Sequence, residues 1–531
     1  MSTLTGTWRL VRFTMRRDRI RLGVWFVTLV GLFSVSASSL ADLYPTQAKI
    51  VAYTTLFGHN PALVVFAGPG YGFDHPNLGN ILVNETQLWW MVIAALMSVF
   101  LVGRHTRGEE DVERAELVLA NVVGRHALTA ASMVVVSALN IAIGIGIATT
   151  AVLCGYPLVG SIALAASCTG VGLVFVGLTA VAAQLTNTNR GTLGVGSGLV
   201  LAAFIVRAIG DVSTPWLRWF SPIGWAQAIR AYAGEQWWTL AISLAVALGL
   251  TTLAFLLAAR RDLGSGLIAP RRGRDRARNW LVHPVGFALR AQRGSILIWL
   301  VSMLITGYVY GTIATDVDEM VASNPDLAAI FAQLRGATVT DSYFGTTMMM
   351  LGLISSGFAI SSALGPNSEE HAGRTESVLT GAISRTRWLL SWLFVSATGT
   401  ALIIATAGLG VGISYARSTG DAGEIPRLVG AAMVTVPGAL VLIGAAIAIY
   451  GLVPHAAVTA WSLLAVVAIV GFFGELFRIP HWLQQVSPFE HLPAAPAEPI
   501  TVLPLCVLSV IALGLGALGC WGLRRRDIGT H

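Results

Sequence analysis

Long apolar runs are the feature that most constrains how this chain can fold. Twelve segments are mostly apolar over about 20 residues, the length that a helix needs to cross the hydrocarbon core of a membrane. They lie near residues 22–41, 86–103, 127–153, 158–184, 191–210, 236–259, 295–315, 343–364, 388–413, 428–453, 456–475 and 500–523. The runs predict an all-α polytopic membrane protein with twelve transmembrane helices.

The composition excludes the main soluble classes. Charged residues make up 11% of the 531 residues, against about 25% in an ordinary soluble domain. That is too little polar surface for a soluble enzyme, a secreted scaffold or a disordered chain. The four cysteines lie in or beside apolar runs and form no CxxC pair, so we interpret them as small buried side chains. They are Cys154, Cys168, Cys506 and Cys520.

No motif for bond chemistry is found in the sequence. Lys49 is the only lysine, and the segment LYPTQAKI around it lacks the glycine-rich turn of a nucleotide-binding P-loop. HExxH and GxSxG motifs are absent. We therefore expect no ATPase site, catalytic residue or resident cofactor in this chain. Asp74 and His75 are adjacent, but no third metal ligand is spaced near them, so an ordered external loop is the favoured interpretation.

The placement of arginine predicts the orientation in the membrane. An even number of spans puts both termini on one side, together with residues 104–126, 185–190, 260–294 and 365–387. That side holds 26 of the 34 basic residues, and the positive-inside rule makes it cytoplasmic. We expect a multi-pass protein of the cell inner (plasma) membrane, with no cleavable signal peptide. Contact of the basic segments with membrane lipids is favoured over nucleic-acid binding.

The chain repeats its own sequence. The segment EEDVERAELVLANVVGR at 109–125 shares seven residues with EEHAGRTESVLTGAISR at 369–385, all at one offset of 260. A similar match joins ARRDLG at 259–264 to RRRDIG at 524–529, and another joins RRDRIRLGVW, which starts at Arg16, to RAQRGSILIW, which starts at Arg290. Charged residues rarely agree in this order by chance, so the matches indicate a duplicated architecture.

The duplication predicts three parts of the chain. They are a first six-span half at 1–264, a basic cytoplasmic linker at 265–284 and a second six-span half at 285–531. Because each half has an even number of spans, both halves enter from the same side. They are therefore expected to be parallel repeats about an axis along the membrane normal, with a pathway between them.

The segments 109–125 and 369–385 are expected between the second and third span of each half. Their acidic starts and arginine ends suit the dipole of a helix. Glu110 and Arg114, like Glu370 and Arg374, are spaced i, i+4 and can pair on a helix surface. A single segment of this kind is most simply a solvated helix. Its presence in both halves favours a second interpretation, in which two copies of a soluble partner dock there.

These features resemble the fused permeases of ABC-2-type (type V) exporters. They look most similar to the actinobacterial tetronasin/polyketide-antibiotic group of multidrug ABC exporters, over essentially the whole chain. The resemblance is carried by EExxxRxE at 109–116 and 369–376, by the arginine-rich segments 9–21 and 281–294, and by the SP-containing loops after the fifth and eleventh spans.

The resemblance implies that the repeated segments are coupling helices for two copies of a soluble ABC ATPase, which would bind ATP and Mg. The implied docking residues are Glu109, Glu110, Arg114 and Glu116 in the first half and Glu369, Glu370, Arg374 and Glu376 in the second. It also implies amphipathic elbow helices at 9–21 and 281–294. Glu113 matches Gly373 in the repeat, so we hypothesise that the two docking sites are inequivalent.

Candidate pathway residues lie in the second, fifth and eighth spans. Methionine and aromatic side chains there are most simply lipid-facing, but the resemblance implies that these spans help to line the central interface. The candidates are Trp89, Trp90, Met97, Phe100, Arg207, Met348 and Met349. Arg207 is a charge inside a span, which either snorkels to the outer interface, faces a cavity, or pairs with the region of Glu475 and Arg478 in the other half.

Two hypotheses of function follow from the sequence. The first is an export permease, itself not an enzyme, that extrudes hydrophobic or amphiphilic compounds such as antibiotics or lipid-like molecules. The alternative is an ion-coupled secondary transporter with twelve spans, which requires buried carboxylates near the middle of the membrane. The acidic residues fall almost entirely in loops or at span edges, which favours the exporter.

Overall fold

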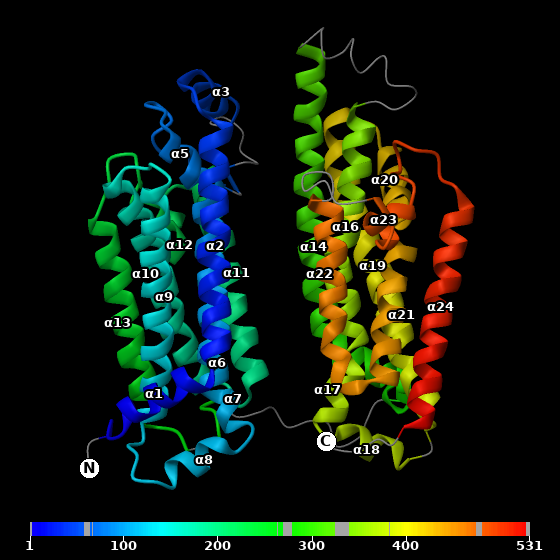
Figure 1. Cartoon of the computed structure of the whole chain (residues 1–531), viewed down its shortest axis with the longest axis horizontal. Helices are drawn as coiled ribbons and strands as arrows, with labels where there is room; N and C mark the ends of the chain where they lie inside the picture. The colour runs from blue at the N-terminus through cyan, green and yellow to red at the C-terminus, as the bar shows by residue number, and fades with distance from the viewer. Residues whose placement is uncertain are drawn as a thin grey trace. The chain divides into compact units, whose positions relative to one another are not determined.

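A computed structural model of the chain describes residues 3–57, 64–65, 67–262, 264–268, 279–323, 339–381, 383–473 and 481–526. Across these residues the regular structure is helical, without strands. The chain forms two compact units, Met1–Gly273 and Arg274–His531, each a bundle of long helices (Figure 1). Within the described ranges, eleven helices are long and apolar enough to cross a membrane. The prediction of an all-α polytopic membrane protein is confirmed.

The first unit contains six of these spans. They are α2 (Arg19–Leu43), the stretch Leu78–Glu110, α9 (Ala127–Leu153), α10 (Leu158–Leu185), α11 (Asn189–Val212) and α13 (Trp238–Ala258). The second span joins α5 (Leu78–Leu82), the π-helix Val83–Gln87, α6 (Leu88–His105) and α7 (Arg107–Glu110). One end of the bundle carries α1 (Thr7–Arg17), α7 and α8 (Arg114–Leu119), and the other carries α3 (Gln47–Phe57) (Figure 1).

The second unit contains the other five spans. They are formed by α14 (Pro284–Ser323), α16 (Val339–Ala363) continuing into α17 (Gly365–His371), α19 (Arg385–Thr419), α20 with α21 (Glu424–Met433 and Val436–Leu452), and α24 (Val502–Arg525). One end carries α17 and α18 (Arg374–Leu379), and the short helix α23 (His481–Gln484) lies toward the other (Figure 1). We call the end with α7 and α8, or with α17 and α18, the motif end of its unit.

The predicted eleventh span, near 456–475, is shorter than a membrane span. A 3-10 turn starts at Pro454, and α22 (Ala460–Phe473) follows it. The described apolar stretch Pro454–Val470 therefore counts as a short apolar helix, and residues 474–480 lie outside the description. The described chain thus has eleven spans by length where the sequence predicts twelve.

Among the residues that the structure describes, a separate helix precedes the first span in the first half but not in the second. α1 ends at Arg17 and α2 begins at Arg19, because Asp18 between them leaves helical geometry with φ −101° and ψ 16°. α14 instead runs without a break from Pro284, after the 3-10 turn Asn279–Val282. The predicted elbow helix at 281–294 is therefore corrected to the beginning of the span itself.

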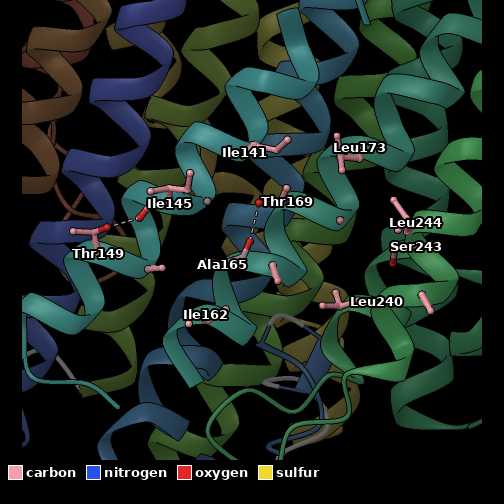
Figure 2. A pocket seen from close by; sticks show the side chains of 15 residues that line it. Ile141, Ile145, Thr149, Ile162, Ala165, Thr169, Leu173, Leu240, Ser243 and Leu244 are labelled. Carbon is pink, nitrogen blue, oxygen red and sulfur yellow. Dashed lines mark hydrogen bonds between the residues drawn. The ribbon is translucent and has the colours of Figure 1, made fainter. Parts of the chain in front are cut away.

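Helix packing in the first unit leaves a groove between α9, α10 and α13 (Figure 2). Its volume is about 490 Å³, and small or apolar side chains such as Ala148, Ala166 and Leu244 line it. α10 and α13 are not pressed together here. A methyl group added at Gly170 would lie 3.4 Å from the Cβ atom of Ser243, an ordinary van der Waals distance.

The corresponding helices of the second unit, α21 and α24, pack backbone against backbone. A methyl group at Gly451 would lie 2.1 Å from the carbonyl oxygen of Gly519, and one at Gly444 would lie 2.7 Å from that of Ala512. Glycine allows this approach because it has no Cβ atom, and small residues drive close helix packing in membranes. The glycine-rich texture of these spans is thus explained by packing.

Candidate functional site

The repeated segments fold alike at the motif ends. In each half a short helix continues the second span and another short helix follows after a turn. α8 and α18 begin at Arg114 and Arg374, which match at the repeat offset. The preceding residues, Glu113 and Gly373, have left-handed backbones with φ of 59° and 68°. Glycine adopts this conformation freely and glutamate at a cost, which explains why glycine suits this position in the second half.

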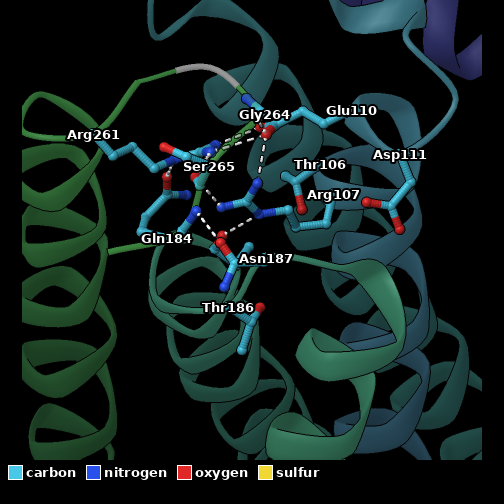
Figure 3. Close-up of polar contacts among 12 residues, drawn as sticks. Thr106, Arg107, Glu110, Asp111, Gln184, Thr186, Asn187, Arg261, Gly264 and Ser265 are labelled. Carbon is cyan, nitrogen blue, oxygen red and sulfur yellow. Dashed lines mark hydrogen bonds and ion pairs between the residues drawn. The ribbon is translucent and has the colours of Figure 1, made fainter. Parts of the chain in front are cut away.

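Glu110 lies at the centre of a largely buried ion-pair network (Figure 3). Arg261, just after α13, donates hydrogen bonds from both terminal nitrogens to its carboxylate, with Nη1 2.9 Å from Oε2 and Nη2 bonded to Oε1. Arg107 also donates from Nη1 to Oε2, at 2.8 Å. The side chain of Glu110 is 7% exposed, so water screens these pairs little.

Arg107 connects this network to the fourth span. Its side chain is fully buried, and its Nε donates to the carbonyl oxygen of Ala183 in α10 at 2.7 Å. Its Nη2 donates to the carbonyl oxygen of Ser265 at 2.6 Å, while Nε of Arg261 donates to Gln184 Oε1 at 2.6 Å. The repeated segment, the end of α10 and the chain after α13 are therefore held as one polar cluster.

Glu370 occupies the equivalent position in the second half. Arg526, just after α24, donates from Nη1 to Oε1 at 2.8 Å and from Nη2 to Oε2 at 2.6 Å. The hydroxyl of Tyr450 in α21 donates to Oε2 at 2.6 Å. Burial alone lowers the pKa of Arg526, but its hydrogen bonds and ion pair with Glu370 outweigh burial and raise the pKa. The arginine therefore stays charged.

A second arginine completes each network. Arg125 donates to the carbonyl oxygen of Arg261 at 2.7 Å, and Arg385 donates to that of Arg526, also at 2.7 Å. Arg261 and Arg526 are matching positions of the ARRDLG and RRRDIG repeats. We call the two sets the arginine clamps: Glu110, Arg125 and Arg261 in the first half, and Glu370, Arg385 and Arg526 in the second. Each clamp ties the repeated segment to the end of the last span of its own half.

The preceding acidic residues make different bonds in the two halves. Glu109 is buried and accepts two hydrogen bonds from Arg17, at 3.0 and 2.9 Å. Glu369 instead accepts two from Arg374, at 2.7 and 2.8 Å, and this bonding raises the pKa of Arg374. The sequence repeat places Ala291 where the first half has Arg17. The acidic residue of the second half therefore pairs within its own segment.

Asp18 carries a further buried cluster where α1 meets α2. His105 Nε2 lies 2.7 Å from Asp18 Oδ2, and Arg104 Nη2 lies 3.4 Å from Oδ1. Burial raises the pKa of Asp18, but its hydrogen bonds with His105 and Arg104 outweigh burial and hold the pKa below its usual value. The repeat places Gln292 at this position, and its side-chain oxygen accepts a hydrogen bond from Ser362.

The structure divides the predicted docking residues into two groups. Exposed on α8 and α18 are Arg114, Glu116, Arg374 and Glu376. Engaged in the ion pairs above are Glu109, Glu110, Glu369 and Glu370, although Arg374 is the partner of Glu369. Next to the exposed charges, Leu117 is 73% exposed.

The predicted i, i+4 pairs are wrong in both halves. Glu110 is bonded to Arg261 and Arg107 rather than to Arg114, and Arg374 is bonded to Glu369 rather than to Glu370. The cause is the left-handed residue before each second short helix. It places the acidic residue and the following arginine on two different helices, so helical spacing no longer applies between them.

The candidate pathway residues lie in different surroundings. Met97 and Met348 are buried in the cores of their units, and Met349 is half-buried. Trp89 and Phe100 are 45% and 43% exposed. Trp90 packs edge-on against Phe33 and donates to the carbonyl oxygen of Leu29 at 3.2 Å. The groove of Figure 2 is lined by other residues.

Arg207 is bound to the loop between the first two spans. It is fully buried, and its guanidinium contacts Asp211 at 3.2 Å and the carbonyl oxygens of Val64 and Val65 at 3.2 and 2.5 Å. These acceptors compensate a charge that would otherwise be costly to bury. Glu475 and Arg478, the partners suggested by the sequence, lie outside the described residues.

Sequence reasoning assigned no partner to Arg107, Arg261 or Arg526. A signal existed, because ARRDLG and RRRDIG end the two halves at matching positions. Arginine after a span is however already explained by the positive-inside rule. The bond to an acidic residue about 150 positions earlier, as in the pair of Glu110 and Arg261, becomes visible only in three dimensions.

Two related bundles of membrane-length helices, each with a polar motif at one end, define a duplicated polytopic membrane protein. A family model described as the C-terminal domain of the multidrug efflux system permease Rv1217c matches residues 281–524. Over 99% of its length the chain is 35% identical to the multidrug efflux system permease protein Rv1217c of Mycobacterium tuberculosis (strain ATCC 25618 / H37Rv), of which it covers 96%. The chain therefore belongs to the Rv1217c family of multidrug efflux permeases.

This membership confirms the expectation of a multi-pass multidrug efflux permease. The match to the family model begins at residue 281, close to the predicted start of the second half. Neither protein description mentions tetronasin or polyketide antibiotics. That part of the resemblance stays a prediction.

Proposed function

We propose that this chain is the transmembrane subunit of an ATP-driven exporter of the ABC type, which extrudes hydrophobic or amphiphilic compounds. Two copies of a soluble ABC ATPase would bind ATP and Mg and dock at the two motif ends, on the cytoplasmic side of the plasma membrane. The chain itself would catalyse no reaction. The observation that carries this proposal is the duplicated arginine clamp, with an exposed short helix beside each copy.

The exposed helix α8 has the character of a protein interface. Leu117 is 73% exposed, and Val112 and Val122 on either side of it are 53% and 69% exposed. Arg114 and Glu116 lie among them and are exposed as well. Exposed apolar side chains that form a patch within a charged surface are typical of a site that binds another protein. A soluble ATPase subunit would cover these side chains and pair with the charges.

The clamps supply the link from a docked ATPase to the spans. In the first half, Glu110 joins the repeated segment to Arg261 after α13, and Arg107 joins it to α10. In the second half, Glu370 is bonded to Arg526 after α24 and to Tyr450 in α21. Two-pronged bonds between arginine and carboxylate fix geometry as well as energy. A displacement of α8 or α18 would therefore move the fourth and last spans with it.

The decisive experiment reconstitutes the full chain with the ABC ATPase that co-purifies with it from native membranes. We expect the double variant Glu116→Arg/Glu376→Arg to lose complex formation and stimulated ATP hydrolysis, because both exposed charges are reversed. Glu490→Arg, an exposed change far along the chain from both segments, is the matched control and should keep both. Unchanged binding and hydrolysis in the double variant would contradict docking at α8 and α18.

The same preparation distinguishes the ion-coupled alternative. The chain alone, in proteoliposomes with a proton gradient, is expected to show no uphill transport of an apolar dye. Transport should require the ATPase and ATP together. Uphill transport driven by the gradient in the absence of the ATPase would replace the exporter proposal with a secondary transporter.

A further inference from the structure

The groove between α9, α10 and α13 lies in the part of the spans farthest from the motif end. Its lining on α13 begins at Leu240, just after the helix starts at Trp238, and its lining on α10 begins at Ile162, just after that helix starts at Leu158. Both helices start at the end opposite the motif. Trp237 and Trp238 are 44% and 57% exposed, as tryptophans at a membrane–water interface are. The groove therefore starts at one interface and extends into the apolar layer.

The rim of the groove is apolar and accessible. Ile141, Ile145 and Leu244 are 48%, 63% and 54% exposed, although they lie on membrane-length helices. The volume of about 490 Å³ is within the range of about 300 to 1,000 Å³ that is usual for small-molecule sites. An occupant must therefore be mostly apolar and of drug-like size.

One polar group in this lining has no partner. Ser243 is 1% exposed, lines the groove (Figure 2), and its hydroxyl makes no hydrogen bond to any described residue. Ser509, on the last span of the second half, bonds to the carbonyl oxygen of Leu505 at 2.7 Å. Buried hydroxyls are normally bonded. The Ser243 oxygen is buried against α10 as well as unbonded, so an occupant of the groove can bond to it once the side chain rotates toward the groove.

The depth of Ser243 selects the kind of occupant. It follows Trp238 by five residues, which places it about 7 to 8 Å along the helix from the interface. At that depth a phospholipid offers only methylene groups, so its chain would leave the hydroxyl unbonded. We propose that the groove binds an elongated apolar compound with an isolated hydrogen-bond acceptor, such as a carbonyl or ether oxygen, bonded to Ser243. This inference rests on the proposed function, of which it specifies the substrate class.

Binding of Nile red to the full chain in lipid nanodiscs tests the proposal without an ATPase. Nile red is an apolar dye with one ring carbonyl, and the saturable fluorescence above empty nanodiscs measures its binding. Ser243→Ala removes the hydroxyl and should weaken binding about three- to tenfold, the range expected for one hydrogen bond. Ala166→Trp fills the groove and should abolish saturable binding. Ser509→Ala, the same change where the hydroxyl is already bonded, should leave the affinity unchanged.

The outcomes separate the inference from the proposed function. Wild-type affinity in Ser243→Ala overturns the role of the hydroxyl, and that variant retains the packing of α13 even if Ala166→Trp does not fold. A phospholipid that co-purifies with the wild type, is lost in Ala166→Trp and is not displaced by Nile red makes the groove a lipid site and overturns the proposal. Failure of the chain to engage an ATPase affects the exporter proposal alone, because dye binding requires no partner.

Discussion

The two motif ends share a clamp and differ in what surrounds it. Glu110 and Glu370 are each held by the arginine that follows the last span of their half. Glu109 is bonded across to Arg17 before the first span, whereas Glu369 is bonded to Arg374 in its own segment. The link to the last span is thus common to both halves, and the link to the first span is specific to one.

This difference shows what the duplication has kept. The matching residues of the repeat include both arms of the clamp, while Arg17 and Asp18 have the neutral counterparts Ala291 and Gln292. The first half therefore gains a separate helix, α1, that is fastened to the repeated segment by charge. No described residue of the second half provides this fastening, and its exposed arginine pairs locally. The two surfaces offered to a partner are chemically different in this respect.

Breaking the clamp should have the largest effect. Arg526→Ala removes the cationic partner of Glu370 and leaves only the Tyr450 hydroxyl donating to it, and loss of one partner of a buried pair costs about 3 to 5 kcal/mol. Arg261→Ala should cost less, because Arg107 stays paired with Glu110. Thermal unfolding of the purified protein, followed by size-exclusion chromatography after heating, ranks the two variants.

The neighbouring arginines are the matched controls for the clamp. Arg260 and Arg524 carry the same charge at the ends of the same helices but are exposed. Their alanine variants should unfold within a degree or two of the wild type, as exposed substitutions usually do. Equal losses of thermal stability in Arg260→Ala and Arg261→Ala would mean that net charge, and not the clamp, stabilises the motif end.

The second comparison concerns glycines on α10 and α21, the matching helices of the two units. Gly451→Ala would press a methyl group against the Gly519 backbone, and overpacking of this kind costs about 1 to 3 kcal/mol. Gly170→Ala, on the corresponding helix of the first unit, meets Ser243 at an ordinary distance and should be tolerated. The two variants can be compared by the same thermal assay. If both were tolerated, the close packing of α21 against α24 would not be a constraint on stability.

The sequence predicts the spans better than it predicts the site. The bounds of α9 and α10 agree with the apolar runs to within a residue, because hydropathy and length are sufficient for a helix in lipid. The repeated segment was also located, but its internal pairing was not. A single left-handed residue at Glu113 or Gly373 breaks the helical spacing from which the pairs were inferred.

The partners of the clamp were beyond sequence reasoning for a different reason. Arg261 and Arg526 are far along the chain from the acidic residues that they bind, and several exposed arginines flank them. Nothing in residue type distinguishes Arg260 from Arg261. Only the direction in which the chain leaves α13 decides which guanidinium faces Glu110, and that direction depends on tertiary packing.

Substitutions in the turn before α8 and α18 should change the stability by a smaller amount, with opposite signs in the two halves. Gly373→Ala forces a side chain into the left-handed region and should cost about 1 kcal/mol, although its Cβ would meet no other atom. Glu113→Gly relieves the same strain in the first half and should be neutral or slightly stabilising. The difference between the two shifts in unfolding temperature is the measured quantity. Destabilisation by Glu113→Gly would indicate that its side chain has a role that outweighs the backbone strain.

The smallest effect is expected for the acid dependence of the first half. The lowered pKa of Asp18 means that its carboxylate stabilises the folded state above its unfolded pKa of about 4, and that this contribution is lost as pH falls through the folded value. Asp18→Asn should therefore be less stable than the wild type at neutral pH, and the gap should narrow below about pH 4. Gln292→Glu places a carboxylate at the matching position of the second half. No positive pair equivalent to Arg104 and His105 follows the second span there, so this carboxylate should not gain the stabilisation that Asp18 has. A gap between Asp18→Asn and the wild type that stays constant from pH 7 to about pH 3 would show that Asp18 contributes through packing and not through its charge.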